Sequence, residues 1–195
     1  MVSLARFIEG PNGEIDWGIP DEELFRYIND QEITFDTHLY GRKMYENMEG
    51  YWANLNENPA ATEHKVQFAR TWREISKIVF SKTLEKVEWN AKLVRENIME
   101  EMTQLKSQSG KNLSLGGAHL ASTFMKLDLI DEYQLYVHPV LLGRGTPLCR
   151  AIEDIILLKF VEARTFSSGV VHFAIRSRND RKGRHDYKND LKLLI

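Results

Sequence analysis

The sequence predicts an α/β fold whose central sheet is mainly parallel and ends in a C-terminal antiparallel hairpin. Between residues 111 and 147 the chain alternates as strand, glycine turn, helix and strand, and so short a crossover joins parallel strands. Two β-prone runs flank the polar turn of residues 166–169, a pattern that is typical of a hairpin. The length of 195 residues suits one sizeable domain.

The first half of the chain also alternates between β-prone and amphipathic runs. Residues 2–8 predict a strand, and residues 21–30 predict a helix because carboxylates occupy its first turn, where the helix dipole favours them. Helix 62–73 has mixed charges, and we expect it to be mostly exposed to solvent. The remaining expected elements are strands over residues 33–40, 75–80, 93–95, 112–115, 130–140, 155–163 and 169–176, and helices over residues 42–48, 98–107 and 118–127.

The composition is that of an ordinary globular protein, with 43% hydrophobic and 28% charged residues. The formal net charge of −2 gives no general attraction to nucleic acid. The single cysteine, Cys149, excludes an intrachain disulfide and fits a reducing compartment. No apolar run could span a bilayer, and the first residues lack the core of a signal peptide, so we expect a cytoplasmic protein.

The C-terminal tail differs in composition from the rest of the chain. We expect one domain over residues 1–176, followed by a basic tail over residues 177–195. From Arg176 onwards the chain has seven Lys and Arg residues but three Asp residues. Such a tail binds an acidic partner, as in an interaction module, or is simply solvated. Its last residues are apolar enough to pack against the domain.

Gly116 and Gly117 stand between a predicted strand and a predicted helix. The helix N-terminus would bring free N–H groups and the positive end of the dipole to the end of the strand, and glycine lets an anion approach closely. The pair is often only a tight turn, and it lacks the G-x-G-x-x-G spacing of the dinucleotide fingerprint. Binding of a nucleotide phosphate here is therefore a hypothesis.

A second turn, Gly41-Arg42-Lys43, also follows a predicted strand. Cations in the first turn of a helix oppose the helix dipole, and a bound anion would relieve this conflict. Alternatively, Glu46 and Glu49 pair with the two cations at helical spacing. The sequence leaves both interpretations open.

Ser81, Lys82 and Thr83 follow a third predicted strand. Two hydroxyls and an ammonium group suit a phosphate monoester, although the same residues also form ordinary polar turns. Because the carboxyl ends of parallel strands lie along one edge of a sheet, the three turns together favour a nucleotide more strongly than any one does. The hydroxyl–ammonium cluster favours an extra phosphate, and hence NADP over NAD.

Five motifs taken in order resemble the dihydrofolate-reductase-like fold: G-R-K-x-Y, S-K-T-L, L-G-G-A-H-L, L-x-D-E and P-V-L-L-G-R-G-T-P-L. They are most similar to the reductase domain of the bifunctional riboflavin-biosynthesis deaminase–reductase and its stand-alone relatives. The resemblance covers residues 3 to about 174. It implies a three-layer α/β/α domain, an NADPH-dependent reductase and a homodimer. Its substrate would be a small heterocycle, either the pyrimidine 5-amino-6-(5-phosphoribosylamino)uracil or a pteridine such as dihydrofolate.

The resemblance also implies roles for particular residues. Residues 81–83 would lie near the adenosine phosphate, and residues 116–120 would hold the pyrophosphate. Trp17 and the loop of residues 12–16 would border the nicotinamide and the substrate. The full set of implied cofactor contacts is Gly41, Arg42, Lys43, Ser81, Lys82, Thr83, Gly116, Gly117, Ala118, His119 and Leu120.

Two stretches depart from the family pattern. The family usually has Ser-Leu-Asp-Gly in its first strand, where this chain has Ser3-Leu4-Ala5-Arg6. The riboflavin-pathway reductases place a glutamate before the glycine pair, where this chain has Leu115, so we expect a more apolar site. These changes weaken the riboflavin-pathway assignment more than the NADPH assignment. The alternative is an NADP-binding protein without turnover that acts as a homodimeric binding module.

Few side chains suggest a catalytic role. Asp16 is the one candidate for a proton relay, or it caps the turn before Trp17, whose ring stacks on a ligand or belongs to the core. His119 contacts a pyrophosphate or is an exposed helix residue, and His138 is expected to be a buried structural histidine. The histidines do not group at metal spacing, so we expect no metal, and no nucleophile–base pair is visible.

Overall fold

The computed structural model describes residues 1–55, 59–110, 112–149, 152, 155–178 and 193–194. The helices are α1 (Glu22–Glu32), α2 (Arg42–Trp52), α3 (Glu63–Glu74), α4 (Ile98–Ser107) and α5 (Ala118–Lys126), with a 3-10 turn, η1, at Asp16–Gly18. The strands are β1 (Val2–Ser3), β2 (Phe7–Glu9), β3 (Phe35–Gly41), β4 (Ser76–Phe80), β5 (Ala91–Val94), β6 (Asn112–Gly116), β7 (Glu132–His138), β8 (Thr146–Pro147), β9 (Leu158–Thr165), β10 (Val171–Ser177) and β11 (Leu193–Leu194).

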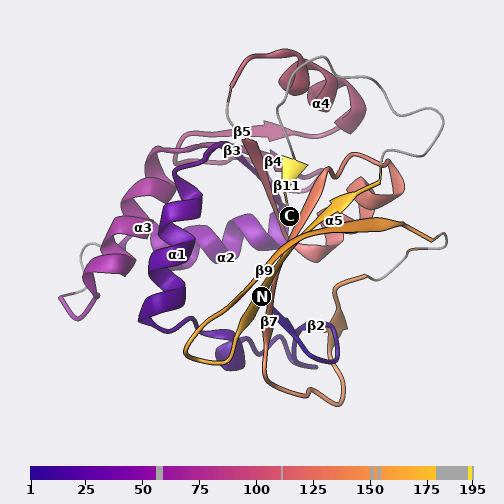
Figure 1. The fold of residues 1–195 in the computed structure, drawn as a ribbon. Helices are drawn as coiled ribbons and strands as arrows, with labels where there is room; N and C mark the ends of the chain where they lie inside the picture. Colours follow the sequence, from indigo (N-terminus) through magenta and orange to yellow (C-terminus); the bar gives the residue numbers. More distant parts are fainter. Residues whose placement is uncertain (56–58, 111, 150–151, 153–154, 179–192, 195) are drawn as a thin grey trace.

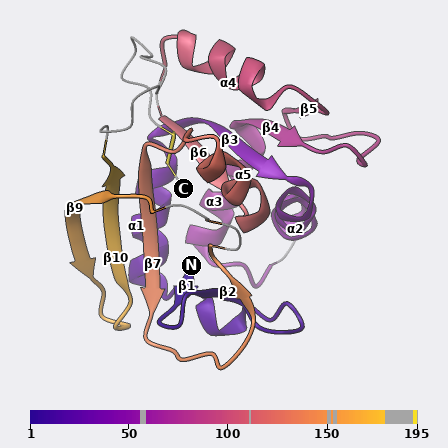
Figure 2. The ribbon, with the colours of Figure 1, turned by 90° about the vertical axis from the view of Figure 1, so that its right-hand side faces the viewer.

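One nine-stranded sheet forms the middle layer, in the order β5-β4-β3-β6-β11-β7-β10-β9, with β1 also paired to β7. Helices α1, α2 and α3 cover one face, and α4 and α5 cover the other (Figures 1 and 2). The strands from β5 to β7 run parallel, and β9 and β10 are antiparallel. The predicted fold class is therefore confirmed. β6 and β7 are parallel, as the crossover predicted.

The main core lies between the sheet and helices α4 and α5. Apolar side chains from alternate strand positions, such as Leu113 and Leu115 of β6, pack there against Leu120, Ala121 and Phe124 of α5. The spacing of these three helix residues places them on one face, which explains why this short segment is a buried helix. Among the described residues, no helix is long and apolar enough to cross a bilayer.

The predicted single strand over residues 2–8 is wrong. The backbone turns at Arg6, which has a left-handed φ of 66°, and the Arg6 amide donates to the Ser3 carbonyl at 2.8 Å. β1 therefore pairs with β7, whereas β2 leaves the sheet and forms a two-stranded ribbon with β8. No local signal marks this turn, because an arginine occupies a conformation that usually requires glycine.

The expectation that helix 62–73 is mostly exposed is also wrong. Phe68, Ala69 and Trp72 of α3 are buried, and Trp72 is only 1% exposed. Their spacing places one stripe against Phe25 of α1. The charged residues at the other positions of the helix make its overall composition polar, so composition alone does not reveal the apolar stripe.

The end of the chain belongs to the sheet. Leu193 pairs with Leu113 of β6, and Leu194 pairs with Ser114 of β6 and with Glu132 of β7. Because β10 occupies the other side of β7, β1 and β11 share one side of that strand, at opposite ends of it. Residues 193–194 thus pair with the sheet, while the rest of the tail, residues 179–192 and 195, lies outside the described residues.

Candidate functional site

Three turns lie side by side at one edge of the sheet. In the parallel ladders, Tyr40 of β3 lies opposite Gly116 of β6, and Gly41 lies opposite Phe80 of β4. The strands therefore end in register, and neighbouring strands are about 4.8 Å apart. We call the edge formed by residues 41–43, 81–83 and 116–117 the carboxyl edge (Figure 2). The sequence predicted this common placement.

Two helix N-termini meet at the carboxyl edge. Gly117 caps α5 with a φ of 99°, and Gly41 caps α2, in both cases without a side-chain hydrogen bond to the first turn. Within these fully described helices, neither first turn contains an acidic residue. By contrast, Asp21 caps α1, and Glu22 and Glu23 occupy its first turn. The carboxyl edge therefore presents the first-turn N–H groups and the positive dipole ends of two helices to an anion.

The glycines of this edge differ in how tightly they are packed. A Cβ on Gly116 would lie 2.8 Å from Cε1 of Tyr40, and one on Gly117 would lie 3.1 Å from Cβ of Met44. A Cβ on Gly41 would lie 3.6 Å from Cβ of Leu120, an ordinary contact. The pair that opens α5 is therefore required by its surroundings, whereas Gly41 is not.

The next three residues of the predicted pyrophosphate turn differ in how exposed their side chains are. The side chains of Ala118 and Leu120 are buried, and His119 is exposed. The first two can offer a ligand only their backbone N–H groups. His119 is the one of the three whose side chain is accessible.

Arg42 and Lys43 at the start of α2 are both exposed and both paired. Arg42 NH1 lies 3.4 Å from Glu46, at helical spacing, as one interpretation of the sequence held. Lys43 Nζ instead lies 3.0 Å from Glu9 Oε2 on β2. The same carboxylate accepts a hydrogen bond from Thr146 Oγ1 of β8 at 2.7 Å. Sequence reasoning missed Glu9 and Thr146, because a long-range contact leaves no local signal.

Ser81, Lys82 and Thr83 form a turn that is stabilised from within. Ser81 Oγ accepts hydrogen bonds from the amides of Thr83 at 3.2 Å and Leu84 at 3.1 Å. Arg95 donates to the Lys82 carbonyl at 3.3 Å. Lys82 and Thr83 are exposed. The backbone of these residues thus forms the polar turn that one interpretation predicts. The Lys82 ammonium group and the Thr83 hydroxyl group remain accessible from solvent.

Trp17 lies at the same edge through its contact with β7. Its ring packs edge-on against His138, the last residue of β7, with 5.8 Å between the ring centroids. Burial lowers the pKa of the His138 imidazole, so this ring is neutral at neutral pH. Asp16 is the exposed first residue of η1, and its Oδ1 accepts a hydrogen bond from the Trp17 amide at 3.1 Å.

The positions that depart from the family pattern fall into two environments. Arg6 is exposed in the turn between β1 and β2, beside the half-buried Ala5. Leu115, in contrast, is 3% exposed and belongs to the main core. The Leu115 side chain therefore packs in the core against α5, and the expectation that it makes the site more apolar stays a prediction.

Comparison with known proteins decides the family. Residues 1–172 match the family of the RibD C-terminal domain. The chain belongs to this family. The uncharacterized protein YyaP of Bacillus subtilis (strain 168) is 42% identical over 173 residues, which cover 87% of this chain and 88% of that protein. The resemblance that the motifs carried is thus confirmed.

Solved structures agree in fold. A putative riboflavin biosynthesis protein from Shewanella sp. PV-4 superposes with a TM-score of 0.69 at 20% identity, over 91% of this chain and 95% of that one. The diaminohydroxyphosphoribosylaminopyrimidine deaminase/5-amino-6-(5-phosphoribosylamino)uracil reductase of Thermotoga maritima gives a TM-score of 0.62 at 16% identity, over 91% of this chain and 54% of that one. This RibD-type chain therefore has the dihydrofolate-reductase-like fold and spans about half of the bifunctional protein.

Proposed function

We propose that this RibD-type domain is an NADPH-dependent reductase of a small heterocyclic substrate. The substrate is the pyrimidine 5-amino-6-(5-phosphoribosylamino)uracil or a close analogue, with a pteridine such as dihydrofolate as the other choice. The observation that carries the proposal is the pair of glycine-capped helix N-termini on adjacent strands, without an acidic residue in the first turn of either. Membership of a family whose usual activity is reduction supports the same conclusion.

The residues of the carboxyl edge fit the phosphates of NADPH. The backbone N–H groups that open α5 and α2 would hold the pyrophosphate. Arg42, which pairs with Glu46 one helical turn away on the exposed surface, would place its guanidinium group near the phosphates. Ser81, Lys82 and Thr83 would hold the additional phosphate that separates NADPH from NADH. Lys43 contributes less, because Glu9 already compensates its charge.

Bound NADPH would supply the hydride, and the chain would supply position and a proton path. Trp17, which is held against His138 by its ring and to the Glu14 carbonyl by its indole N–H at 3.1 Å, would form a rigid border of the substrate position. Asp16, next to it, would exchange a proton with solvent because it is exposed. We also propose a cytoplasmic location, which suits the free thiol of Cys149.

A second candidate function is binding of NADP without turnover. Ala5 and Arg6 stand where the family usually has an acid and a glycine, and Asp16 is already engaged by the Trp17 amide. If these changes remove the proton donor, the carboxyl edge still binds the dinucleotide, and the chain acts as a homodimeric binding module.

Turnover separates the two candidates. The full chain is mixed with NADPH and, in separate samples, with 5-amino-6-(5-phosphoribosylamino)uracil and with dihydrofolate, and the absorbance of NADPH is followed. Loss of absorbance with one substrate supports the reductase. Binding of NADPH without loss in either sample supports the second candidate, and failure to bind NADPH contradicts both. Asp16→Asn is expected to reduce kcat and leave NADPH binding unchanged.

A further inference from the structure

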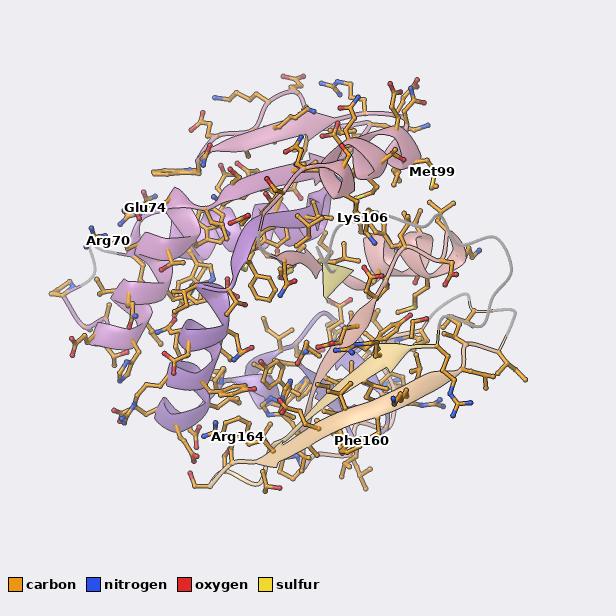
Figure 3. All side chains as sticks on the ribbon, turned by 45° about the horizontal axis from the view of Figure 1, so that its top comes forward. Arg70, Glu74, Met99, Lys106, Phe160 and Arg164 are labelled. Atoms are coloured by element: carbon orange, nitrogen blue, oxygen red, sulfur yellow. The ribbon has the colours of Figure 1, made fainter. Side chains whose placement is uncertain are left out.

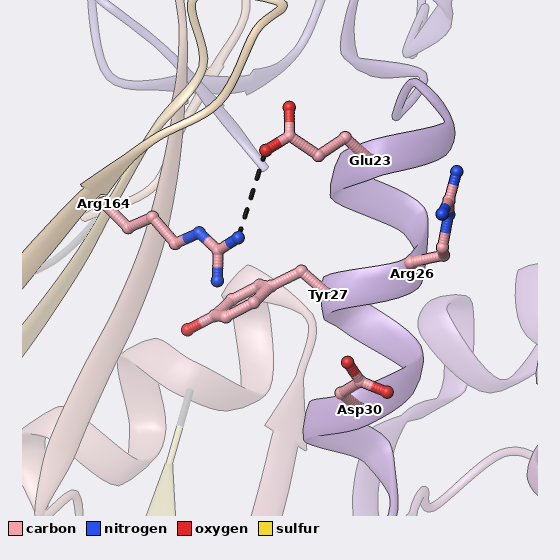
Figure 4. Close-up of a pocket in the computed structure, with 5 residues that line it drawn as sticks. All are labelled: Glu23, Arg26, Tyr27, Asp30 and Arg164. Atoms are coloured by element: carbon pink, nitrogen blue, oxygen red, sulfur yellow. Dashed lines mark ion pairs between the residues drawn. The ribbon is translucent and has the colours of Figure 1, made fainter.

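A pocket of about 270 Å³ lies between α1 and β9 (Figure 4). It is lined by Glu23, Arg26, Tyr27, Asp30 and Arg164. Three of these, Glu23, Tyr27 and Asp30, recur at helical spacing, so α1 presents them as one row. None of the five residues belongs to the carboxyl edge or to the proposed substrate border at Trp17. The pocket is therefore separate from the proposed dinucleotide and substrate positions.

Two aromatic rings hold the guanidinium group of Arg164 in place. It lies 4.7 Å from the ring centroid of Tyr27 and 5.1 Å from that of Phe166. The two rings pack against each other edge-on, with 5.3 Å between their centroids. Contact with a ring face orients a guanidinium group without engaging its N–H donors. Arg164 is therefore oriented before any ligand binds.

The N–H donors of the Arg164 side chain are available to a ligand. Its ion pair with Glu23 measures 4.0 Å, which is too long for a hydrogen bond. The Glu23 carboxylate instead accepts hydrogen bonds from the amide and the hydroxyl group of Ser167, at 2.9 and 2.6 Å. Within the described residues, Arg164 donates no side-chain hydrogen bond. Its planar fork matches a carboxylate.

A free carboxylate lies across the Tyr27 ring from Arg164. This carboxylate belongs to Asp30, which is exposed and forms no hydrogen bond or ion pair with any of the described residues (Figure 4). Arg26, four residues before Asp30, pairs with Glu22 at 2.8 Å instead. The pocket therefore has one available charge of each sign, on opposite sides of one ring.

Hydrogen bonds below the pocket fix the direction of the Tyr27 hydroxyl proton. Gln134 Nε2 donates to Glu132, whose charge Arg176 balances at 3.0 Å. Gln134 Oε1 therefore accepts from His172 Nε2, which leaves His172 Nδ1 as an acceptor, 3.4 Å from the Tyr27 hydroxyl oxygen. His172 is 1% exposed, and burial lowers its pKa, so the ring is neutral at neutral pH. The Tyr27 hydroxyl thus donates inward, and its oxygen remains an acceptor for a ligand.

We propose that this pocket binds a free α-amino acid. The carboxylate of the ligand pairs with the Arg164 guanidinium group. Its ammonium group donates to the Tyr27 oxygen and pairs with Asp30. A zwitterion fits better than a simple anion or cation, because either of those leaves one charge of the pocket without a partner.

Ligands that carry one or both charges test the site. The full chain, without nucleotide, is titrated with glycine and with L-phenylalanine, and backbone amide NMR spectra are recorded. At least one of the two should shift the amides of residues 23–30 and 164–167 until they saturate. Acetate and methylammonium, which each carry one of the two charges, should bind at least about tenfold more weakly. The proposal is overturned if neither amino acid shifts these amides, or if a singly charged probe binds as tightly as the amino acid.

Three variants assign the contacts. Arg164→Gln should weaken the amino acid and acetate alike, because both use the guanidinium group. Asp30→Asn and Tyr27→Phe should weaken the amino acid at least about threefold and leave acetate unchanged, because they alter only the ammonium position. The controls are Arg70→Gln on α3 and Asp128→Asn after α5, which lie outside the pocket and should bind like the wild type.

The variants also separate a binding role from a structural one. Arg164→Gln and Asp30→Asn change exposed side chains, and Tyr27→Phe keeps the ring, so all three should melt close to the wild type. Wild-type affinity of Arg164→Gln for the amino acid overturns the proposal, and so does an equal loss of amino acid and acetate binding in Asp30→Asn. None of these samples contains a nucleotide, so this proposal and the reductase proposal fail separately.

Discussion

Lys43 Nζ of α2 lies 3.0 Å from Glu9 Oε2 of β2, although the two residues are 34 positions apart. This contact joins the first turn of α2 to the β2–β8 ribbon, and Thr146 of β8 binds the same carboxylate. A negative charge is therefore held next to the helix N-terminus that we propose to bind phosphate. The contact positions Lys43, but the carboxylate opposes any anion at the carboxyl edge.

Glu9→Gln should strengthen the binding of NADPH. The glutamine amide keeps a hydrogen bond to Thr146 but removes the negative charge beside the N-terminus of α2. Loss of this repulsion should improve the binding free energy of the anion by about 0.3–1 kcal/mol, which is about two- to fivefold in the dissociation constant. The control is Glu88→Gln, whose exposed partner Lys86 lies 2.7 Å away in another part of the surface. Weaker binding by Glu9→Gln, measured by fluorescence titration, would mean that the salt bridge is needed to shape the site.

Arg6→Gly should stabilise the protein. Arg6 has a φ of 66°, and this left-handed conformation costs an L-residue about 1–2 kcal/mol. Glycine removes this strain, but part of the gain is offset because glycine increases the conformational entropy of the unfolded chain. The free energy of unfolding in urea should therefore rise by about 0.5–1 kcal/mol. Arg6→Ala keeps the strain and should show no gain. A gain in both variants would point to the charge of Arg6 rather than to its backbone.

The position of Arg6 also explains what the sequence could not predict. The β-prone residues around it predicted one strand over residues 2–8, because nothing local marks an arginine that adopts the conformation of a glycine. The strand endings at Gly41, Phe80 and Gly116, by contrast, were predictable. Each is marked by glycine or polar residues directly after an apolar run, and the parallel register brings them together.

The stability of the protein should rise with pH in the alkaline range because of Lys77. This lysine is 1% exposed, and its ammonium donates to the carbonyls of Ile75 at 2.8 Å and Trp89 at 2.7 Å. Burial lowers its pKa from 10.5 to about 8. Between these values the unfolded chain binds the proton and the folded chain does not, so raising the pH favours the folded state.

Urea unfolding at several pH values between about 8 and 10.5 measures this effect. We expect the free energy of unfolding to increase by about 1–3 kcal/mol across the range. Lys77→Met has no proton to lose and should give a flatter profile. A wild-type profile as flat as that of Lys77→Met would show that the two carbonyls keep the ammonium charged at high pH.

Leu193→Pro should destabilise the domain, because β11 lies between β6 and β7 and proline removes a backbone donor from the ladder. We expect a loss of about 1–3 kcal/mol and a lower melting temperature by circular dichroism. Leu193→Val keeps the N–H group and should melt close to the wild type. Equal melting of all three proteins would mean that the sheet does not depend on its last strand.

Long-range pairing limited the rest of the sequence-based interpretation. Lys43 has Glu46 and Glu49 at helical spacing, yet it pairs with Glu9 from a different element. Leu115 follows an alternating pattern that does not say which face is the core, and the structure places its side chain in the core. Periodicity reveals which residues share a face, but not what that face meets.

The most direct test of the central claim is a fluorescence titration of the full chain with NADPH and with NADH. The variants are Arg42→Ala and Ser81→Ala at the carboxyl edge. Arg70→Ala is the control for the first, because Arg70 also pairs with a glutamate four residues on, Glu74 at 3.2 Å, on the exposed surface of α3 (Figure 3). Ser107→Ala, in the last turn of α4, is the control for the second.

We predict that the wild type binds NADPH at least about tenfold more tightly than NADH, that Arg42→Ala weakens both ligands, and that Ser81→Ala weakens NADPH alone. Both controls should bind like the wild type. Equal affinity for the two ligands, or NADPH binding that neither Arg42→Ala nor Ser81→Ala changes, would contradict the assignment of the carboxyl edge as the dinucleotide site.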